Sequence, residues 1–307
     1  MSLPPKSVEI VEVGPRDGLQ SEAKVLPTAT KLEFIRRLVA AGLSRIEVAS
    51  FVNPKRVPQM ADAEAVLAGL AGSQPAASYI GLILNRKGFD RARAAGCGEV
   101  GMAIAASESF SQRNQGLSVD EGITSWLEIA SAARAAGIRA QVTISTAFGC
   151  PFEGEVPVSR VLEIAKRLAA GTPDEIAVAD TIGVAVPSQV SEVIAELRVA
   201  MPGTKLRAHF HNTRNTGLAN AYAAVQGGVD ALDASCGGIG GCPFAPAATG
   251  NIPSEDLCYM LHRMGIRTGV DLPALVETSR WLQDTLEHAV PGMVVKAGLF
   301  PRPVENA

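Results

Sequence analysis

Two of the four histidines in this chain, His209 and His211, lie two residues apart at the end of a short apolar segment. On a β-strand, residues i and i+2 point to the same face, so both imidazoles would face one space. Two imidazole nitrogens that converge in this way suit a divalent metal ion. A pair of hydrogen-bonded structural histidines has the same spacing, so the motif alone leaves both interpretations open.

Other reactive side chains also follow or interrupt short apolar segments. Each has an ordinary structural explanation when taken alone, such as a surface ion pair, a turn or a flexible loop. The glycine-rich segment 235–243 is not a dinucleotide-binding motif, because Pro243 stands where the third glycine would be. The residues in question are Arg16 and Asp17, Glu47, Asp180, Cys242 and Asn251.

The elements that would position these residues form one repeating pattern of a short apolar strand, a loop and an amphipathic helix. Eight such β/α units in about 270 residues are typical of a TIM (β/α)8 barrel, and a doubly wound α/β sheet is the main alternative. We expect one catalytic domain over residues 1–307, with a C-terminal helical extension over about 271–307. The expected strands are 8–13, 45–49, 77–84, 99–105, 139–145, 175–179, 206–210 and 229–234. Helices are expected over 58–70, 119–136, 157–170, 187–200, 217–226 and 272–287. Two further helices begin at 28 and near 254, and another lies between the third and fourth strands.

A TIM barrel would bring the reactive side chains together, because chemistry sits at the C-terminal ends of its strands. His209, His211 and one carboxylate would provide three metal ligands, and Asn251 could add an oxygen. This donor set suits Mg²⁺ or Mn²⁺ better than a closed tetrahedral zinc site, although zinc stays an alternative. A metal with open positions can polarise a substrate, while Arg16 stabilises oxyanion charge and Cys242 moves a proton.

Composition narrows the class of protein. The chain is 47% hydrophobic and 19% charged, with a net charge of −3, which indicates a globular protein without overall attraction to nucleic acid or anionic membranes. No apolar segment reaches the roughly 18 residues of a membrane helix, and no signal or transit segment is visible. Five cysteines, odd in number and without a CxxC motif, favour reduced thiols. We therefore expect a cytoplasmic protein with a small-molecule substrate.

Several long blocks together resemble the 3-hydroxy-3-methylglutaryl-CoA lyase family, within the metal-dependent TIM-barrel lyases and Claisen-type synthases. The resemblance extends from about residue 8 to residue 266. It implies a (β/α)8 barrel that binds Mg²⁺ or Mn²⁺ and cleaves an acyl-CoA, 3-hydroxy-3-methylglutaryl-CoA, to acetyl-CoA and acetoacetate. The blocks are VGPRDGLQ (13–20), IEVASFVNPKRVPQM (46–60), GCPFEGEV (149–156), ADTIGV (179–184), HFHNT (209–213) and GGIGGCPFAPAATGN (237–251).

The resemblance also implies roles for individual residues. The reaction would be a retro-Claisen cleavage in which a base takes the tertiary hydroxyl proton and an acetyl-CoA enolate leaves. It implies a homo-oligomer, a dimer or a tetramer, acting in leucine degradation and ketone-body metabolism. The implied metal ligands are Asp17, His209, His211 and Asn251. The implied catalytic residues are Arg16 at the thioester oxygen, Cys242 as proton donor, and Glu47, Asp180 and Glu255 as acidic groups. Asn114 would lie in the CoA-binding loop.

Two positions depart from the family pattern. The family reads His-Asp-Thr after the strand, whereas this chain has Asn212, and Arg214 follows. We expect both to lie at the substrate site and to affect substrate identity. A lyase for a related branched 3-hydroxyacyl-CoA is therefore an alternative, as is a condensing acyltransferase of the isopropylmalate, homocitrate or citramalate synthase type. A barrel that only binds a ligand is a third.

Overall fold

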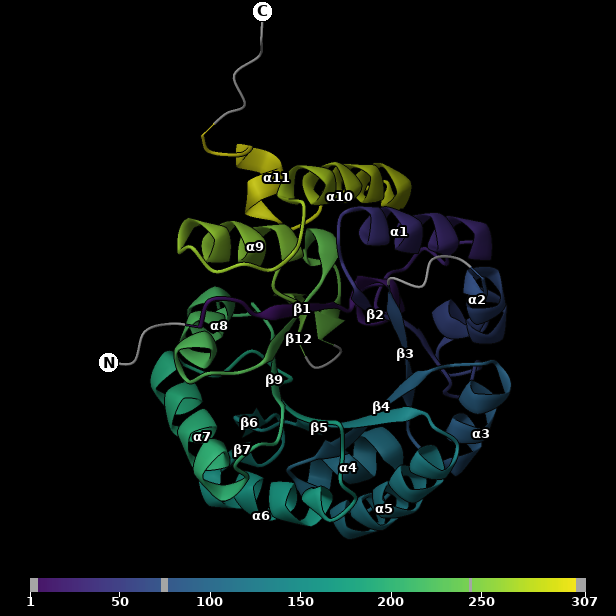
Figure 1. Ribbon diagram of the computed structural model, residues 1–307, viewed down its shortest axis with the longest axis vertical. Coiled ribbons are helices and arrows are strands. Elements are labelled where there is room, and N and C mark those ends of the chain that lie inside the picture. The colour runs from purple at the N-terminus through teal and green to yellow at the C-terminus, as the bar shows by residue number, and fades with distance from the viewer. Residues whose placement is uncertain (1–4, 73–76, 243–244, 302–307) are drawn as a thin grey trace, which may run out of the picture.

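The structure, a computed structural model, describes residues 5–72, 77–242 and 245–301, and within these ranges the side chains of 242–249 are not described. Eight parallel strands close into a barrel (Figure 1), in the order β1-β10-β9-β8-β5-β4-β3-β2. The predicted TIM barrel is confirmed. The strands are β1 (Glu9–Glu12), β2 (Arg45–Ser50), β3 (Ser78–Ile83), β4 (Glu99–Ala105), β5 (Arg139–Ser145), β8 (Glu175–Asp180), β9 (Leu206–Phe210) and β10 (Ala231–Ala234).

Helices surround the barrel as an outer ring (Figure 1). Each presents one apolar stripe to the strands: Val161, Ile164, Ala165 and Leu168 are buried on α6 at the spacing that the sequence predicts. A capping box formed by Ser118 and Glu121 starts α5. The ring consists of α1 (Thr28–Ala40), α2 (Ala63–Leu70), α3 (Arg86–Ala94), α5 (Val119–Ala135), α6 (Val158–Ala169), α7 (Pro187–Ala200), α8 (Gly217–Gln226) and α9 (Ser254–Arg263).

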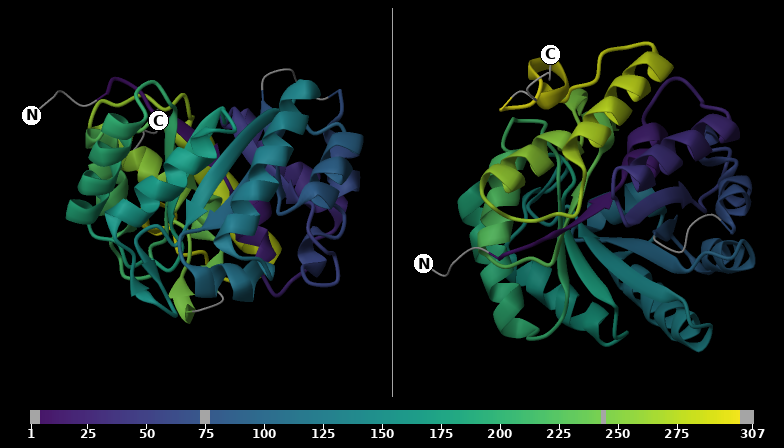
Figure 2. Two further views of the ribbon diagram at one scale, coloured as in Figure 1. Left: turned by 90° about the horizontal axis from the view of Figure 1, so that it is seen from below. Right: turned by 45° about the horizontal axis from the view of Figure 1, so that its top comes forward.

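The C-terminal extension is helical, as expected. Its long helix α10 (Leu272–Leu286) packs against α1 and α9, and a short helix, α11 (Met293–Ala297), follows. Figures 1 and 2 show α10 lying beside α1, although the two are far apart in the sequence. The rings of Phe34 and Trp281 join them, with centroids 6.1 Å apart.

Some elements differ from the sequence expectation. The expected helix 58–70 is divided into a 3-10 helix, Pro58–Met60, and α2. The expected CoA-binding loop around Asn114 is a helix, α4 (Glu108–Gln115), which ends at Gly116 with a φ of 73°. Only Phe110 and Ser111 of α4 are buried, so it has no apolar stripe to reveal it. Two short hairpins, β6 (Gly149–Cys150) with β7 (Gly154–Glu155) and β11 (Gly241–Cys242) with β12 (Ala245–Thr249), stand where loops were expected.

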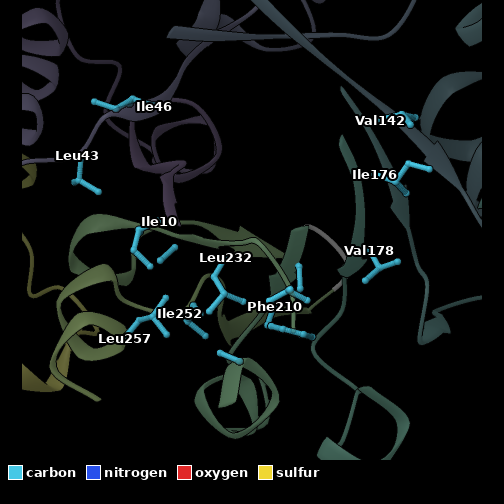
Figure 3. Packing of buried hydrophobic residues seen from close by; sticks show 14 of the residues in the cluster. Ile10, Leu43, Ile46, Val142, Ile176, Val178, Phe210, Leu232, Ile252 and Leu257 are labelled. Carbon is cyan, nitrogen blue, oxygen red and sulfur yellow. The ribbon is translucent and has the colours of Figure 1, made fainter. Parts of the chain in front are cut away.

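The main hydrophobic core lies between the barrel and the helices. Figure 3 shows part of it, with Val142, Val178, Phe210 and Leu232 pointing outward from their strands. Residues at alternate positions on the same strands point into the barrel instead. The hydrophobic core therefore accounts for only one face of each strand.

The barrel interior contains a buried ionic network. Arg45 is 2% exposed and donates to Glu99 Oε1 from Nε at 3.0 Å and from Nη2 at 2.6 Å. It also donates to both oxygens of Glu175, at 3.0 and 2.9 Å. Burial would raise the pKa of Glu99, but the charges of Arg45 and Arg139 outweigh it and lower that pKa. Such buried ions are tolerated only when they are paired, so the loss of one of these residues would leave an unpaired buried charge and destabilise the fold.

Candidate active site

The first active-site residues are carried by a tight turn after β1. The carbonyl of Val13 accepts the backbone N–H groups of Arg16, Asp17 and Gly18, at 3.2, 2.7 and 3.2 Å. The resulting π-helical turn, Gly14–Gly18, requires a glycine at its start, because a Cβ on Gly14 would lie 2.6 Å from the carboxylate of Glu12. The turn presents the side chains of Arg16 and Asp17 at the C-terminal end of the barrel.

Arg16 lies between two carboxylates. Its Nε donates to Glu47 and its Nη1 donates to Asp17 Oδ1 at 2.5 Å. Burial alone would lower the pKa of Arg16, but the charges of Glu47 and Asp17 raise it above its usual range. The guanidinium is therefore a permanent, oriented cation beside the cavity.

Asp17, His209 and His211 converge as the sequence predicts. One potential ligand atom from each lies within 4.8 Å of the others, and the two imidazole centroids are 5.0 Å apart. His209 is oriented by a residue of β10: its Nδ1 lies 3.0 Å from Asp233 Oδ2. That hydrogen bond leaves Nε2 of His209 free to act as a ligand.

Asn251 completes the cluster. Its Nδ2 donates to Asp17 Oδ2 at 2.8 Å and to the Ile239 carbonyl at 3.1 Å, while its Oδ1 is buried without a hydrogen-bond partner among the described residues. His211 Nδ1 is buried and unpaired in the same way. Buried acceptors without donors are costly, and a divalent cation would satisfy both. The residues therefore fit a metal ion.

The protonation states of His211 and Asp17 agree with metal binding, which needs neutral imidazole and ionised carboxylate. Burial and the neighbouring His209 lower the pKa of His211 to about 4. Burial would raise the pKa of Asp17, but Arg16 and the two histidines lower it below its usual range. Burial would lower the pKa of His209, but Asp233 and Asp17 outweigh it and raise that pKa, so metal binding would have to displace a proton from this imidazole.

A cavity of about 980 Å³ opens above this cluster. Arg16, Asp17, Glu47, His209 and His211 line it together, so it holds the candidate catalytic groups and three of the candidate metal ligands. Polar and basic residues from the β2, β3 and β4 side also line it, and these suit a phosphate-bearing ligand. They are Asn53, Arg56, Asn85, Lys87, Arg91, Asn114 and Gln115.

Two predicted acidic residues do not line the cavity. The Asp180 carboxylate accepts the backbone N–H groups of Val184 at 2.9 Å and Ala185 at 3.0 Å, whereas its neighbours Ala179 and Thr181 line the cavity. Burial raises the pKa of Asp180. Glu255, at the start of α9, accepts the N–H of Gly237 at 3.0 Å, and burial raises its pKa to about 8. Both carboxyl groups hold loops in place.

The side chains of the two residues that depart from the family pattern also make hydrogen bonds to backbone groups. Asn212 Oδ1 accepts the N–H of Gly217 at the start of α8, at 3.1 Å. Arg214 Nη1 donates to the carbonyls of Ile182 at 3.0 Å and Gly183 at 2.9 Å. Neither lines the cavity.

Cys242, the predicted proton donor, is described in its backbone alone. It lies in β11 and pairs with Ala245 of β12, and its side chain falls outside the described part of the chain. The preceding residue, Gly241, lines the cavity, so the hairpin reaches the site.

Three residues in or beside the candidate site were missed from the sequence: Glu12, Arg207 and Asp233. Glu12 accepts the N–H groups of Gly14 at 2.7 Å and Cys236 at 2.8 Å and so joins two active-site loops. Asp233 orients His209, and Arg207 lines the cavity. Each is a charged residue inside an apolar strand, which is the same signal that singled out Glu47.

Comparison with known proteins identifies the family to which the chain belongs. The model of the HMGL-like family matches residues 7–282. The chain belongs to the HMGL-like family. It is 44% identical to the (R)-citramalyl-CoA lyase of Chloroflexus aurantiacus over 98% of both chains. It is also 44% identical to the mitochondrial hydroxymethylglutaryl-CoA lyase of Bos taurus, over 95% of this chain and 90% of that protein.

Solved structures agree. The HMG-CoA lyase of Acinetobacter baumannii, in complex with coenzyme A and 3-methylmalate, has a TM-score of 0.93 and 37% identity, and covers 99% of each chain. The hydroxymethylglutaryl-CoA lyase of Pseudomonas aeruginosa has a TM-score of 0.92 and 40% identity, over 96% of this chain and 98% of that one. The predicted family resemblance is confirmed, and this member is a carbon–carbon lyase related to lyases of CoA thioesters. Among its described residues, no helix is long and apolar enough to cross a membrane.

Proposed function

We propose that this HMGL-like protein cleaves a branched 3-hydroxyacyl-CoA by a metal-dependent retro-Claisen reaction, with 3-hydroxy-3-methylglutaryl-CoA giving acetyl-CoA and acetoacetate. One observation carries the proposal. The cluster of Asp17, His209 and His211, with the unpaired Asn251 carbonyl, lies beside the half-buried Arg16 cation at one cavity. We propose Mg²⁺ or Mn²⁺ as the metal, because oxygen and imidazole donors suit these ions.

The chain's own residues account for the other steps. When bound, a divalent cation supplies Lewis acidity to a hydroxyl and a carboxylate of the substrate. Glu47 takes the hydroxyl proton, because it lines the cavity whereas Asp180 and Glu255 do not. The C–C bond then breaks to give a ketone and the enolate of acetyl-CoA. Arg16 stabilises the enolate oxygen.

The last step is protonation of the enolate carbon. We assign the proton to the Cys242 thiol, because this residue directly follows Gly241 in β11, and Gly241 lines the cavity. The basic side chains Arg56, Lys87 and Arg91, together with Asn114, would bind the CoA portion.

A second substrate deserves equal testing, because the (R)-citramalyl-CoA lyase is similar over 98% of this chain. Citramalyl-CoA would use the same groups, with a carboxylate attached directly to the carbinol carbon. The choice between these two thioesters is the most specific part of the proposal.

The test is an assay of purified protein with Mg²⁺ or Mn²⁺ against both thioesters, before and after chelation. We expect acetyl-CoA from at least one, loss of product on chelation, and recovery when metal returns. Asp17→Asn should lose this metal-dependent turnover, with Asp120→Asn, an exposed carboxylate on α5, as its matched control. Release of free CoA from acetyl-CoA and a 2-oxo acid, with no acetyl-CoA formed from either branched thioester, would instead identify a condensing acyltransferase.

A further inference from the structure

Arg207 lies at the floor of the cavity, below the candidate metal ligands. It precedes His209 by two residues on β9, so both side chains point into the barrel. Arg207 is 2% exposed and lines the cavity. Its Nη2 makes one long hydrogen bond, 3.5 Å to Thr143 Oγ1, and its Nη1 has no hydrogen-bond partner among the described residues.

The acidic neighbours of Arg207 do not satisfy its buried donors: Nη1 has no acceptor, and Asp233 Oδ1 near Nε also lacks a hydrogen-bond partner among the described residues. The Nε of Arg207 lies 3.4 Å from Glu175 Oε1 and 3.3 Å from Asp233 Oδ1, but neither contact has hydrogen-bond geometry. Both oxygens of Glu175 accept from Arg45, and Asp233 Oδ2 pairs with His209. Buried donors in folded proteins nearly always have an acceptor, so this guanidinium lacks one that another molecule can supply.

The wall next to Arg207 is made of small side chains. Gly101 and Ala103 on β4 and Thr143 and Ser145 on β5 line the same cavity. Nothing in the fold forces a glycine at 101: its φ is not left-handed, and an added Cβ would meet Gln141 and Ile80 only at ordinary distances of 3.6 and 3.7 Å. The cavity therefore has room for substrate on its β4–β5 side, where Thr143 contacts Arg207.

Charge decides what this space accepts. In the ionic network, the three arginines Arg45, Arg139 and Arg207 face four carboxylates, those of Glu9, Glu99, Glu175 and Asp233. A further carboxylate would add to an excess of negative charge in a desolvated place. A neutral oxygen acceptor satisfies the free donor of Arg207 without that cost.

We propose that Arg207 is an acyl-specificity residue, and that the space between Arg207 and Gly101 receives a C3 branch of the substrate that is larger than methyl and carries a neutral oxygen acceptor. A hydroxymethyl branch is the simplest such group. The inference rests on the proposed lyase function and names the substrate class of the same site. It assigns to Arg207 a contact with substrate and gives Gly101 the role of leaving room for it.

The experiment compares kcat/KM for three 3-hydroxyacyl-CoA substrates that differ only in a methyl, ethyl or hydroxymethyl branch at C3. Wild-type protein should prefer hydroxymethyl over ethyl by about tenfold or more, because a site with a buried donor discriminates against a branch that cannot pair. Arg207→Met should remove this preference, whereas Arg207→Lys should keep part of it. Mn²⁺ affinity and the unfolding temperature of each variant check that the metal site and the fold survive.

Gly101→Val gives a second test that leaves the charges in place. It should lower kcat/KM for the ethyl and hydroxymethyl substrates relative to methyl, and it decides the matter if Arg207→Met does not fold. An unchanged ratio in Gly101→Val, or an equal loss for all substrates in Arg207→Met, overturns the inference. Wild-type cleavage of the methyl substrate alone also overturns the inference but leaves the lyase function standing, whereas no cleavage of any substrate refutes the lyase function itself.

Discussion

Asp233→Asn tests how far the candidate metal site depends on a residue outside the cluster of candidate ligands. Asp233 uses its two oxygens differently: Oδ2 accepts from His209 Nδ1 at 3.0 Å, and Oδ1 lies 3.3 Å from Arg207 Nε. An asparagine has one oxygen and one NH₂ group. Whichever way the amide turns, its NH₂ faces either the His209 N–H or the Arg207 guanidinium.

The size of the effect follows from that conflict. Loss of a carboxylate that orients a ligating histidine typically lowers metal affinity by about 10- to 100-fold, which corresponds to roughly 1.4–2.7 kcal/mol. The loss should lie near the upper end here, because the substitution also removes a negative charge that lies directly behind a candidate metal ligand. His209 is then free to present either nitrogen to the site.

The assay is a Mn²⁺ titration of the protein without substrate, with binding monitored by isothermal calorimetry or electron paramagnetic resonance. Glu196→Gln, an exposed carboxylate on α7, is the matched control and should bind Mn²⁺ as wild type does. A Kd for Asp233→Asn within twofold of wild type would refute the reasoning that Asp233 fixes His209. Unchanged unfolding temperatures would show that any loss of affinity belongs to the site.

Further predictions concern stability. Arg45→Met should lower the free energy of unfolding by about 3–5 kcal/mol in a urea titration, because it leaves Glu99 and Glu175 buried without their shared cation; a loss below 1 kcal/mol would contradict this. Burial raises the pKa of Glu12 to about 7 and that of Glu255 to about 8, from 4.5, so the folded state keeps protons that the unfolded state releases. Stability should therefore fall as pH rises from about 4.5 through 7 and 8, and the double variant Glu12→Gln, Glu255→Gln should flatten this fall in unfolding temperatures measured from pH 5 to 9. Mg²⁺ or Mn²⁺ at about 100 times its Kd should stabilise the protein by about 2.7 kcal/mol, an increase that chelator reverses and that Asp17→Asn should not show.

Strand and helix positions were predictable from the sequence because their patterns are local. The apolar stripe of α6 repeats every three or four residues, and Arg139–Ser145 and Leu206–Phe210 coincide with the predicted strands. The helix α4 was not predictable in this way, because it buries only two side chains and packs over the cavity edge. Elements that bury an apolar face can be read from the chain, and polar elements cannot.

The site residues also differ in how far the sequence could predict their positions. Strand ends correctly indicated where Asp17, His209 and His211 would meet, since parallel strands in a barrel present their C-terminal ends on one rim. The direction of Asp180 was not accessible, because a shift of one residue along a strand turns a side chain from the lumen to the helices. Its neighbour Ala179 faces the cavity, and Asp180 accepts backbone N–H groups instead.

The ionic network inside the barrel is a third case. Arg45, Glu99, Glu175 and Arg207 are visible in the sequence as charges within apolar strands. Which of them pair depends on distances across the closed barrel, between residues as much as 130 positions apart. Local patterns carry no information on such distances.

The hydrogen bond between Asn251 and Asp17 joins residues separated by 234 positions, across the seam where β1 meets β10. A chain emerging from the ribosome presents Asp17 first and must add nearly all of the barrel before Asn251 exists. The four candidate ligands therefore come together only when the barrel closes, and we expect full metal affinity to appear at that step. Metal uptake measured during refolding would report, in real time, the moment at which the last strand docks against the first.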